Sequence, residues 1–184
     1  AQVAPLYGTE FGYGMSAEDT ANAFVQTFAN VFGVAADDLA PGNSVQEDMY
    51  TVPVMYDAAT ETYRFTMVCY RQYRSGWPVY GADLRLLVRN EPGYALVLAN
   101  SALRDLGDYV VPAQAAGSVA EGSAHAAAAA FAPGLVNFSA AELVIWPDGD
   151  GTAALPRVAI VFVADNGQPA SGSYARWRFV ADAA

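Results

Sequence analysis

Few residues of this sequence have the chemistry of a catalytic centre. His125 is the only histidine, and it lies in an alanine-rich stretch where we find no residue at helical spacing to complete a site with it. We therefore expect a histidine on the surface of a helix. Cys69 is the only cysteine, and the strand pattern around it predicts a buried, unreactive thiol. A single cysteine excludes an internal disulfide and a cysteine-based zinc cluster.

The sequence patterns that mark common active sites are missing. The chain has no GxSxG, HExxH, Walker A or GxGxxG pattern. Its aspartates and glutamates are scattered through predicted loops, and no pair of them stands out for acid–base chemistry. We predict a protein that is not an enzyme and needs no cofactor, with an enzyme based on paired carboxylates as an open alternative.

One acidic segment has some features of a calcium-binding loop. In Asp148-Gly149-Asp150-Gly151, carboxylates alternate with glycines that let the chain wrap around an ion. The acidic residue that ends a full EF-hand loop is missing. Because the segment lies between two predicted strands and Asp-Gly is a favoured turn pair, we expect a hairpin turn and no metal site. Whether Asp148 and Asp150 bind calcium stays open.

Charge and composition disfavour several kinds of partner. The chain has nineteen acidic residues against nine basic ones, all arginine, and a formal net charge of −10. This balance repels nucleic-acid backbones and anionic membrane surfaces. The sequence has no run of about eighteen apolar residues, so we expect no membrane span. At 54% hydrophobic and 15% charged residues, the composition predicts a folded globular protein.

The stretch from Tyr70 to Arg89 predicts a β-hairpin with its turn at Ser75-Gly76. We expect Gly81 to mark a bulge or a close backbone approach, and Pro78 to lie at a sheet edge or just outside the sheet. The second strand alternates, which predicts one face toward a core and one toward water. The core-facing residues are Tyr80, Ala82, Leu84, Leu86 and Val88, and the water-facing residues are Asp83, Arg85, Leu87 and Arg89.

The same order of elements occurs twice along the chain. A helix is predicted from Ser16 to Gly33, with Phe24, Phe28, Val31 and Phe32 as its apolar stripe. Strands are predicted at 49–56, 63–73 and 94–100, and Tyr63, Phe65, Met67 and Cys69 form the apolar face of the second of these. A second helix from Ser118 to Phe131 precedes strands at 141–146, 158–164 and 174–180. The fold class is therefore α+β, with two units that each pack a helix on an antiparallel sheet.

The hairpin resembles the fungalysin/thermolysin propeptide (FTP) motif. The resemblance is carried by Gln72-Tyr73, Gly76 and the run Pro78-Val79-Tyr80-Gly81-Ala82-Asp83-Leu84. The second half is similar to a PepSY domain in its helix, its strand Glu142-Leu143-Val144 and its end Phe179-Val180-Ala181-Asp182-Ala183. The resemblance implies two cystatin-like subdomains. We expect an irregular N-terminal arm at 1–15, an FTP-like domain at 16–103, a linker at 104–117 and a PepSY-like domain at 118–184.

Proteins of this family are pro-regions of secreted thermolysin-like metalloproteases, which assist folding of the protease domain and inhibit it until cleavage. The resemblance implies a non-catalytic protein, secreted or at the cell surface, that binds such a zinc metalloprotease domain in cis or in trans. The alternative is a secreted or cell-surface module that binds a peptide or carbohydrate and has no protease partner. The candidate binding residues are Gln72, Tyr73, Trp77, Pro78, Tyr80 and Asp83. Whether this hairpin contacts a partner or only shapes the fold stays open.

Overall fold

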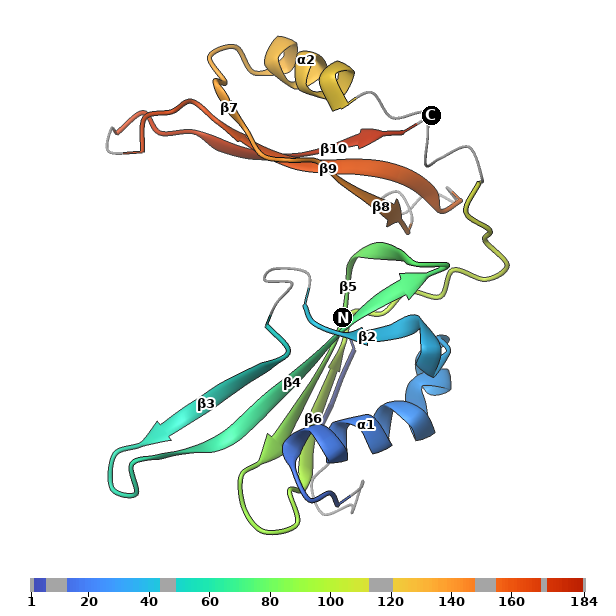
Figure 1. Cartoon of the computed structure of the whole chain (residues 1–184), viewed down its shortest axis with the longest axis vertical. Helices are drawn as coiled ribbons and strands as arrows, with labels where there is room; N and C mark the ends of the chain where they lie inside the picture. The colour runs from blue at the N-terminus through green and yellow to red at the C-terminus, as the bar shows by residue number, and fades with distance from the viewer. Residues whose placement is uncertain are drawn as a thin grey trace. The chain divides into compact units, whose positions relative to one another are not determined.

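A computed structural model describes residues 2–5, 13–43, 49–112, 121–147, 155–169 and 172–183 (Figure 1). The chain divides into two compact units, Ala1–Asp105 and Leu106–Ala184. Their boundary falls inside the segment 104–117, where the sequence predicts a connection. Ten strands and two α-helices are present in the described ranges. The prediction of a mixed helix-and-sheet fold is confirmed at this level, and most of the regular structure is strand.

The first unit has an antiparallel sheet centred on its two longest strands, β4 (Thr62–Arg74) and β5 (Trp77–Arg89). The short β2 (Leu39–Pro41) and β3 (Thr51–Asp57) share the outer edge of β4. On the other side, β6 (Leu96–Ser101) pairs with β5, and β1 (Gln2–Pro5) pairs with β6. The prediction of an irregular arm at 1–15 is wrong for β1, because pairing with β6 gives this segment regular structure.

Helix α1 (Ala17–Phe28) packs on one face of this sheet. Ser16 caps it as predicted, with its Oγ accepting the backbone N–H of Asp19 at 3.1 Å. A 3₁₀ helix, η1 (Ala29–Phe32), continues the chain to Gly33, whose φ of +75° ends it. Val31 is 73% exposed, so its place in the predicted apolar stripe is wrong. The three-residue turn of the 3₁₀ helix rotates Val31 away from the sheet.

The core of the first unit lies between α1 and the sheet. Its largest members on the sheet are fully or almost fully buried, and Leu84, Leu86 and Val88 alternate into it as predicted. On β4, however, α1 covers Val68 and Tyr70, whereas alternation places Phe65 and Met67 on the opposite face. Both faces of β4 carry apolar residues, so its sequence does not indicate which face the helix covers.

The second unit has a smaller antiparallel sheet and helix α2 (Glu121–Phe131), which lies over it in Figure 1. Its central strand is β9 (Arg157–Asp165), with β7 (Asn137–Phe138) and β8 (Glu142–Trp146) along one edge and β10 (Arg176–Asp182) on the other. Ala124 and Ala128 of α2 pack against Ile160 and Phe162 of β9. The predicted cap Ser118 and the segment Asp148–Gly151 lie outside the described residues.

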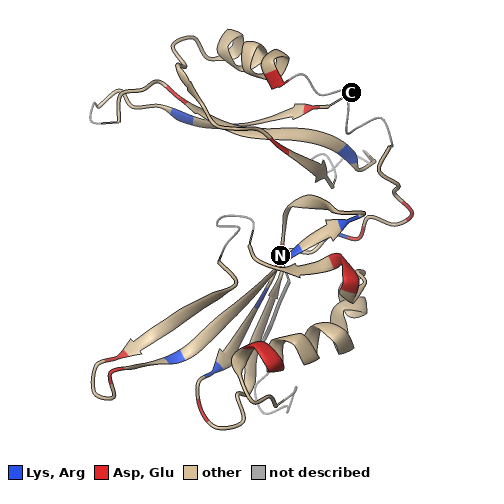
Figure 2. Cartoon of the chain, viewed as in Figure 1, with Lys and Arg blue, Asp and Glu red and all other residues tan. Residues whose placement is uncertain are grey.

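The acidic residues of both units lie at helix starts, in turns and in strands (Figure 2). In the first unit, Glu18 and Asp19 occupy the first turn of α1, where a helix dipole favours negative charge. Asp37 and Asp38 belong to the short 3₁₀ helix η2 (Ala36–Asp38). Neither helix in the described ranges is long and apolar enough to cross a membrane.

Candidate functional site at the β4–β5 hairpin

The hairpin ends in a tight two-residue turn. Ser75 and Gly76 have φ angles of +53° and +81°, and Arg74 lies opposite Trp77. Two positive φ angles are typical of a type I′ turn, whose twist matches that of the flanking strands. Such a turn is closed by a hydrogen-bonded pair, so the next pair, Tyr73 and Pro78, is a non-hydrogen-bonded one. Pro78 lies inside β5, where its missing N–H costs β4 no bond. In the first unit β6 pairs with β5 only from Leu84 to Val88, so Pro78 lies at an edge of that sheet, as predicted.

A bulge follows the turn on β5. Arg71 lies opposite Asp83 and Tyr73 lies opposite Pro78. Gln72 alone separates these pairs on β4, whereas residues 79–82 separate them on β5. Gly81, inside the bulge, has a φ of +64°, and a Cβ placed on it meets no atom within 4 Å. The predicted bulge is thus confirmed, and the requirement for glycine comes from backbone conformation and not from a close approach.

Gln72 faces this bulge and is fully buried, at 0% exposure. Its Nε2 donates to the carbonyl oxygen of Arg104 at 2.7 Å, and its Oε1 accepts the N–H of Arg104 at 2.8 Å. The Gln72 side-chain amide therefore bonds both the N–H and the carbonyl of Arg104, as the backbone of a neighbouring β-strand would. Gln72 fastens the segment after β6 to β4, and its amide is already occupied. The sequence gives no signal of this partner, which is 32 residues away.

Asp83 is also buried, at 4% exposure, although alternation placed it on a face toward water. The guanidinium Nη2 of Arg85 lies 3.3 Å from its Oδ2. The buried Arg71 lies opposite Asp83 in the strand register, and its guanidinium carbon is 5.9 Å from the centre of the Tyr73 ring. Neighbouring positive charge makes it physically reasonable to bury the carboxylate.

The remaining candidate residues have rings and are half-buried: Tyr73, Trp77, Pro78 and Tyr80. Because side chains alternate along a strand, Tyr73 and Pro78 share one face with Arg71. Trp77 lies on the other face beside Arg74, whose Nε is 3.4 Å from Oδ2 of Asp38. The six predicted binding residues are thus close in the hairpin, but they do not form one exposed surface.

His125 is not the surface histidine that the sequence predicts. Its side chain is 23% exposed and packs against the rings of Phe138 and Phe162, with centroid distances of 4.8 and 4.6 Å. Its Nε2 lies 3.7 Å from Oε1 of Glu121, one helical turn earlier, so one carboxylate lies at helical spacing from it, but this pair alone completes no catalytic site. That same Glu121 oxygen accepts the N–H of Ala141. These contacts tie α2 to the sheet of its unit.

The other reactive side chains are structural. Cys69 is buried as predicted, and burial raises the pKa of its thiol, which keeps it protonated at neutral pH. Burial and the hydrogen bond with Tyr50 raise the pKa of the Tyr70 hydroxyl far above its usual value. That hydroxyl donates to Oδ1 of Asn22 at 2.7 Å, which ties α1 to β4. Among the described residues, no three His, Cys, Asp or Glu side chains are grouped closely enough to hold a metal ion.

Comparison with known proteins adds no family assignment. The sequence has no match to a protein-family model and no significant match to a curated protein. The function must therefore be argued from the hairpin, the two units and the chemistry of their exposed surfaces.

Proposed function

We propose that this chain is a non-catalytic, pro-region-like protein that binds a thermolysin-like zinc metalloprotease domain in cis or in trans. It inhibits that domain and assists its folding, in a secreted or cell-surface setting. The observation that supports this most is the local structure of the FTP-like motif. Its Gly81 has a backbone conformation suited to glycine, its Pro78 lies where no N–H is needed, and its Gln72 is fixed to Arg104. Each of these three motif residues therefore has a structural role in the hairpin that depends on its residue type.

The order of elements supports the same proposal. Each unit has one α-helix packed on an antiparallel sheet, which is the arrangement expected of a cystatin-like subdomain. Within the proposal, the first unit is the FTP-like subdomain and the second is the PepSY-like subdomain. Backbone pairing between strand edges and extended segments is a common way to occupy a protease cleft. The net charge of −10 favours a partner surface of positive potential.

Titration of the purified chain into a thermolysin-like protease tests inhibition directly. We expect saturable loss of cleavage of a fluorogenic peptide at micromolar concentrations of the chain. Zinc and calcium are kept in excess, so that metal removal by this acidic chain does not mimic inhibition. The chain unfolded by heat serves as a matched control of identical charge and composition. An unchanged rate with the cognate protease would overturn the inhibitory part of the proposal.

A refolding experiment tests assistance to folding separately. A protease domain unfolded in guanidinium chloride is diluted into buffer with or without the chain, and activity is measured after the chain is removed. We expect a higher yield of active protease in its presence. Equal yields, together with equal rates in the titration, would leave no support for a pro-region role.

A second candidate function is supported by one exposed aromatic pair. Phe131 at the end of α2 is 75% exposed and Trp177 on β10 is 48% exposed. Their ring centroids are 6.5 Å apart with planes at 85°. Exposed rings of this kind stack on sugars or on apolar peptide side chains. This module would bind an oligosaccharide or peptide without a protease, and Trp177→Phe would abolish the change in fluorescence that the ligand causes.

A further inference from the structure

The outer edge of β10 presents backbone N–H and carbonyl groups that could pair with another strand. In the described part of the chain, β10 pairs with β9 and with no strand on its other side. The N–H of Ala183 donates to Val158 at 3.2 Å, and the carbonyl of Ala175 accepts from Asn166 at 3.1 Å. Odd-numbered residues of β10 therefore bond to β9. The backbone groups of the even-numbered residues point to the open edge. These residues are Arg176, Arg178, Val180 and Asp182.

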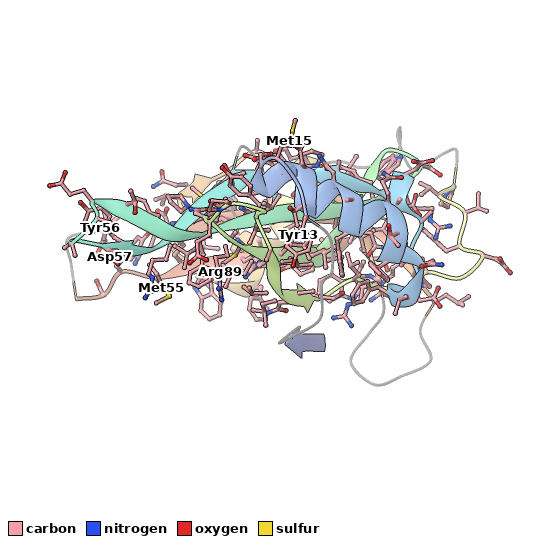
Figure 3. The ribbon with its side chains drawn as sticks, turned by 90° about the horizontal axis from the view of Figure 1, so that it is seen from below. Tyr13, Met15, Met55, Tyr56, Asp57 and Arg89 are labelled. Atoms are coloured by element: carbon pink, nitrogen blue, oxygen red, sulfur yellow. The ribbon has the colours of Figure 1, made fainter. Side chains whose placement is uncertain are left out.

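The open edge of β3 in the first unit shows a contrast. The N–H of Cys69 donates to the carbonyl of Tyr50 at 2.8 Å, so odd-numbered residues of β3 direct their backbone groups away from β4. Two of these outward positions are Pro53, which has no N–H, and Met55, which has a φ of +58°. Met55 lies with Tyr56 and Asp57 at the end of β3 in Figure 3. Proline and kinks of this kind prevent strand pairing at an edge.

The edge of β10 has neither a proline nor a kink that would prevent strand pairing. Its seven residues include no proline, no glycine and no positive φ angle. Trp177 and Val180 are exposed hydrophobic residues of this strand. Only charged side chains, Arg176, Arg178 and Asp182, oppose indiscriminate pairing. Charges at an edge also select a partner, because they stabilise a register that places opposite charges together.

We propose that β10 pairs antiparallel with β10 of a second copy of this chain. With Phe179 on the two-fold axis, Arg176 of each copy lies opposite Asp182 of the other, and Arg178 lies opposite Val180. A shift of the register by two residues in one direction places Arg178 opposite Arg178, which is repulsive. A shift in the other direction places Arg178 opposite Asp182 and Val180 opposite Val180, but it leaves Arg176 beyond the paired segment. The register with Phe179 on the axis is therefore the one that pairs all seven residues of β10 with its charges complementary, as a two-fold symmetric interface requires.

The odd-numbered side chains also fit this pairing. On the face that α2 covers, Phe179 lies opposite Phe179 of the second copy in a non-hydrogen-bonded pair, where side chains are closest. Trp177 lies opposite Ala181, so a large side chain meets a small one. A single strand pair is a small interface, and each chain carries a net charge of −10. The dimer is therefore weak, and its population depends on protein concentration. No protease is needed for it, so it is independent of the proposed function.

Sedimentation analysis of the whole chain over about 5 µM to 500 µM tests the pairing, a range suited to small interfaces. We expect a reversible monomer–dimer equilibrium. Val180→Pro removes an outward N–H without removing a bond to β9, and we expect it to weaken dimerisation at least about tenfold. Val180→Thr keeps the N–H and the branched side chain and should dimerise as the natural chain does. Circular dichroism checks that both variants fold.

Charge exchange tests the register. Arg176→Asp places two carboxylates opposite each other in its own dimer, and Asp182→Arg places two guanidinium groups opposite each other. Each variant alone should be monomeric, whereas their mixture should form a heterodimer with both pairs complementary. Within its own chain, Asp182 pairs with Arg157 at 3.2 Å and Arg176 lies opposite Asp165, so each charge variant also brings like charges together on β9 and β10. The side chains of Asp182 and Arg157 are about half exposed, which limits the cost, and circular dichroism checks that both charge variants fold.

Three outcomes would overturn the proposal. The first is a natural chain that stays monomeric over the whole range of concentration. The second is a dimer that Val180→Pro leaves as stable as before. The third is a mixture of the two charge variants that does not associate more strongly than either variant alone.

Discussion

Gly81 is the residue whose type is most clearly required by the backbone. Its φ of +64° is unfavourable for a residue with a Cβ, although the space around it is open. We expect Gly81→Ala to lower the free energy of unfolding by about 1–2 kcal/mol, measured by urea denaturation. Gly122→Ala in α2 is the matched control, since its Cβ also meets open space and its φ is not positive; it should stabilise by about 0.5–1 kcal/mol. Equal effects of the two variants would contradict this explanation.

Gln72 provides a second test at this scale. Gln72→Leu removes both hydrogen bonds and leaves the backbone N–H and carbonyl of Arg104 without their partner. We expect a loss of about 2–4 kcal/mol in the free energy of unfolding. Gln26→Leu, at an exposed position of α1, should change it by less than about 0.5 kcal/mol. If Gln72→Leu is as mild as the control, Gln72 does not fasten Arg104 in solution.

Asp165 provides a test that depends on pH. The side-chain amide of Asn137 and the N–H of Gly167 both donate to its Oδ1 at 2.8 Å, and they lower the pKa of its carboxyl below 3.8. A carboxyl with a lowered pKa stabilises the fold above that pH range, and this contribution is lost as the pH falls below about 3.8. NMR titration should give a midpoint below 3.8 that Asn137→Ala raises. A midpoint that Asn137→Ala does not change would contradict this role of the amide.

At the scale of elements, the residue types in the Ser75-Gly76 turn are not the most stabilising ones for its backbone conformation. Ser75 adopts a φ of +53°, and asparagine tolerates this conformation better than serine does. We expect Ser75→Asn to raise the free energy of unfolding by about 0.5 kcal/mol, and Ser75→Val to lower it because a β-branched residue resists positive φ. Thermal unfolding followed by circular dichroism measures both changes. Destabilisation by Ser75→Asn would show that the turn is not of type I′ in solution.

The long elements could be predicted because each carries its own pattern. Alternation over β4, β5, β9 and β10 is a local signal, and the predicted bounds of these strands differ from the observed ones by two residues or fewer. The start of α1 at its Ser16 cap was also predicted, but α1 ends at Phe28 and a 3₁₀ helix continues to the predicted end at Gly33. The short strands β1, β2 and β7 were missed. They have four, three and two residues, and only pairing with a longer strand makes them regular. The face of β4 predicted to be apolar is not the face that α1 covers, because both faces of this strand carry apolar residues.

The candidate site was less predictable than the fold, because its key contacts join residues far apart in sequence. The bulge at Gly81 and the turn at Ser75-Gly76 follow from local chemistry and were predicted. The pairing of Gln72 with Arg104 spans 32 residues and was not. The burial of Asp83 depends on arginines of two strands, whereas alternation alone placed it in water. A pattern within one strand contains no information on such neighbours.

For the whole molecule, the two hydrogen bonds between Gln72 and the backbone of Arg104 bear on where the first unit ends. The sequence predicts a domain end at residue 103, whereas the structure divides the chain after Asp105. Arg104, the backbone partner of Gln72, lies between these two limits. The first unit has its own core between α1 and the sheet, so we expect a fragment of residues 1–105 to fold alone.

A fragment of residues 1–103 lacks Arg104, so the amide of Gln72 is left buried without its two hydrogen bonds. We expect it to be less stable than the 1–105 fragment by about 2 kcal/mol or more, as measured by urea unfolding followed by circular dichroism. Gln72→Leu should destabilise the 1–105 fragment but have much less effect on the 1–103 fragment, since the contact that it removes is already lost. Equal stability of the two fragments would show that Arg104 is not part of the folded unit.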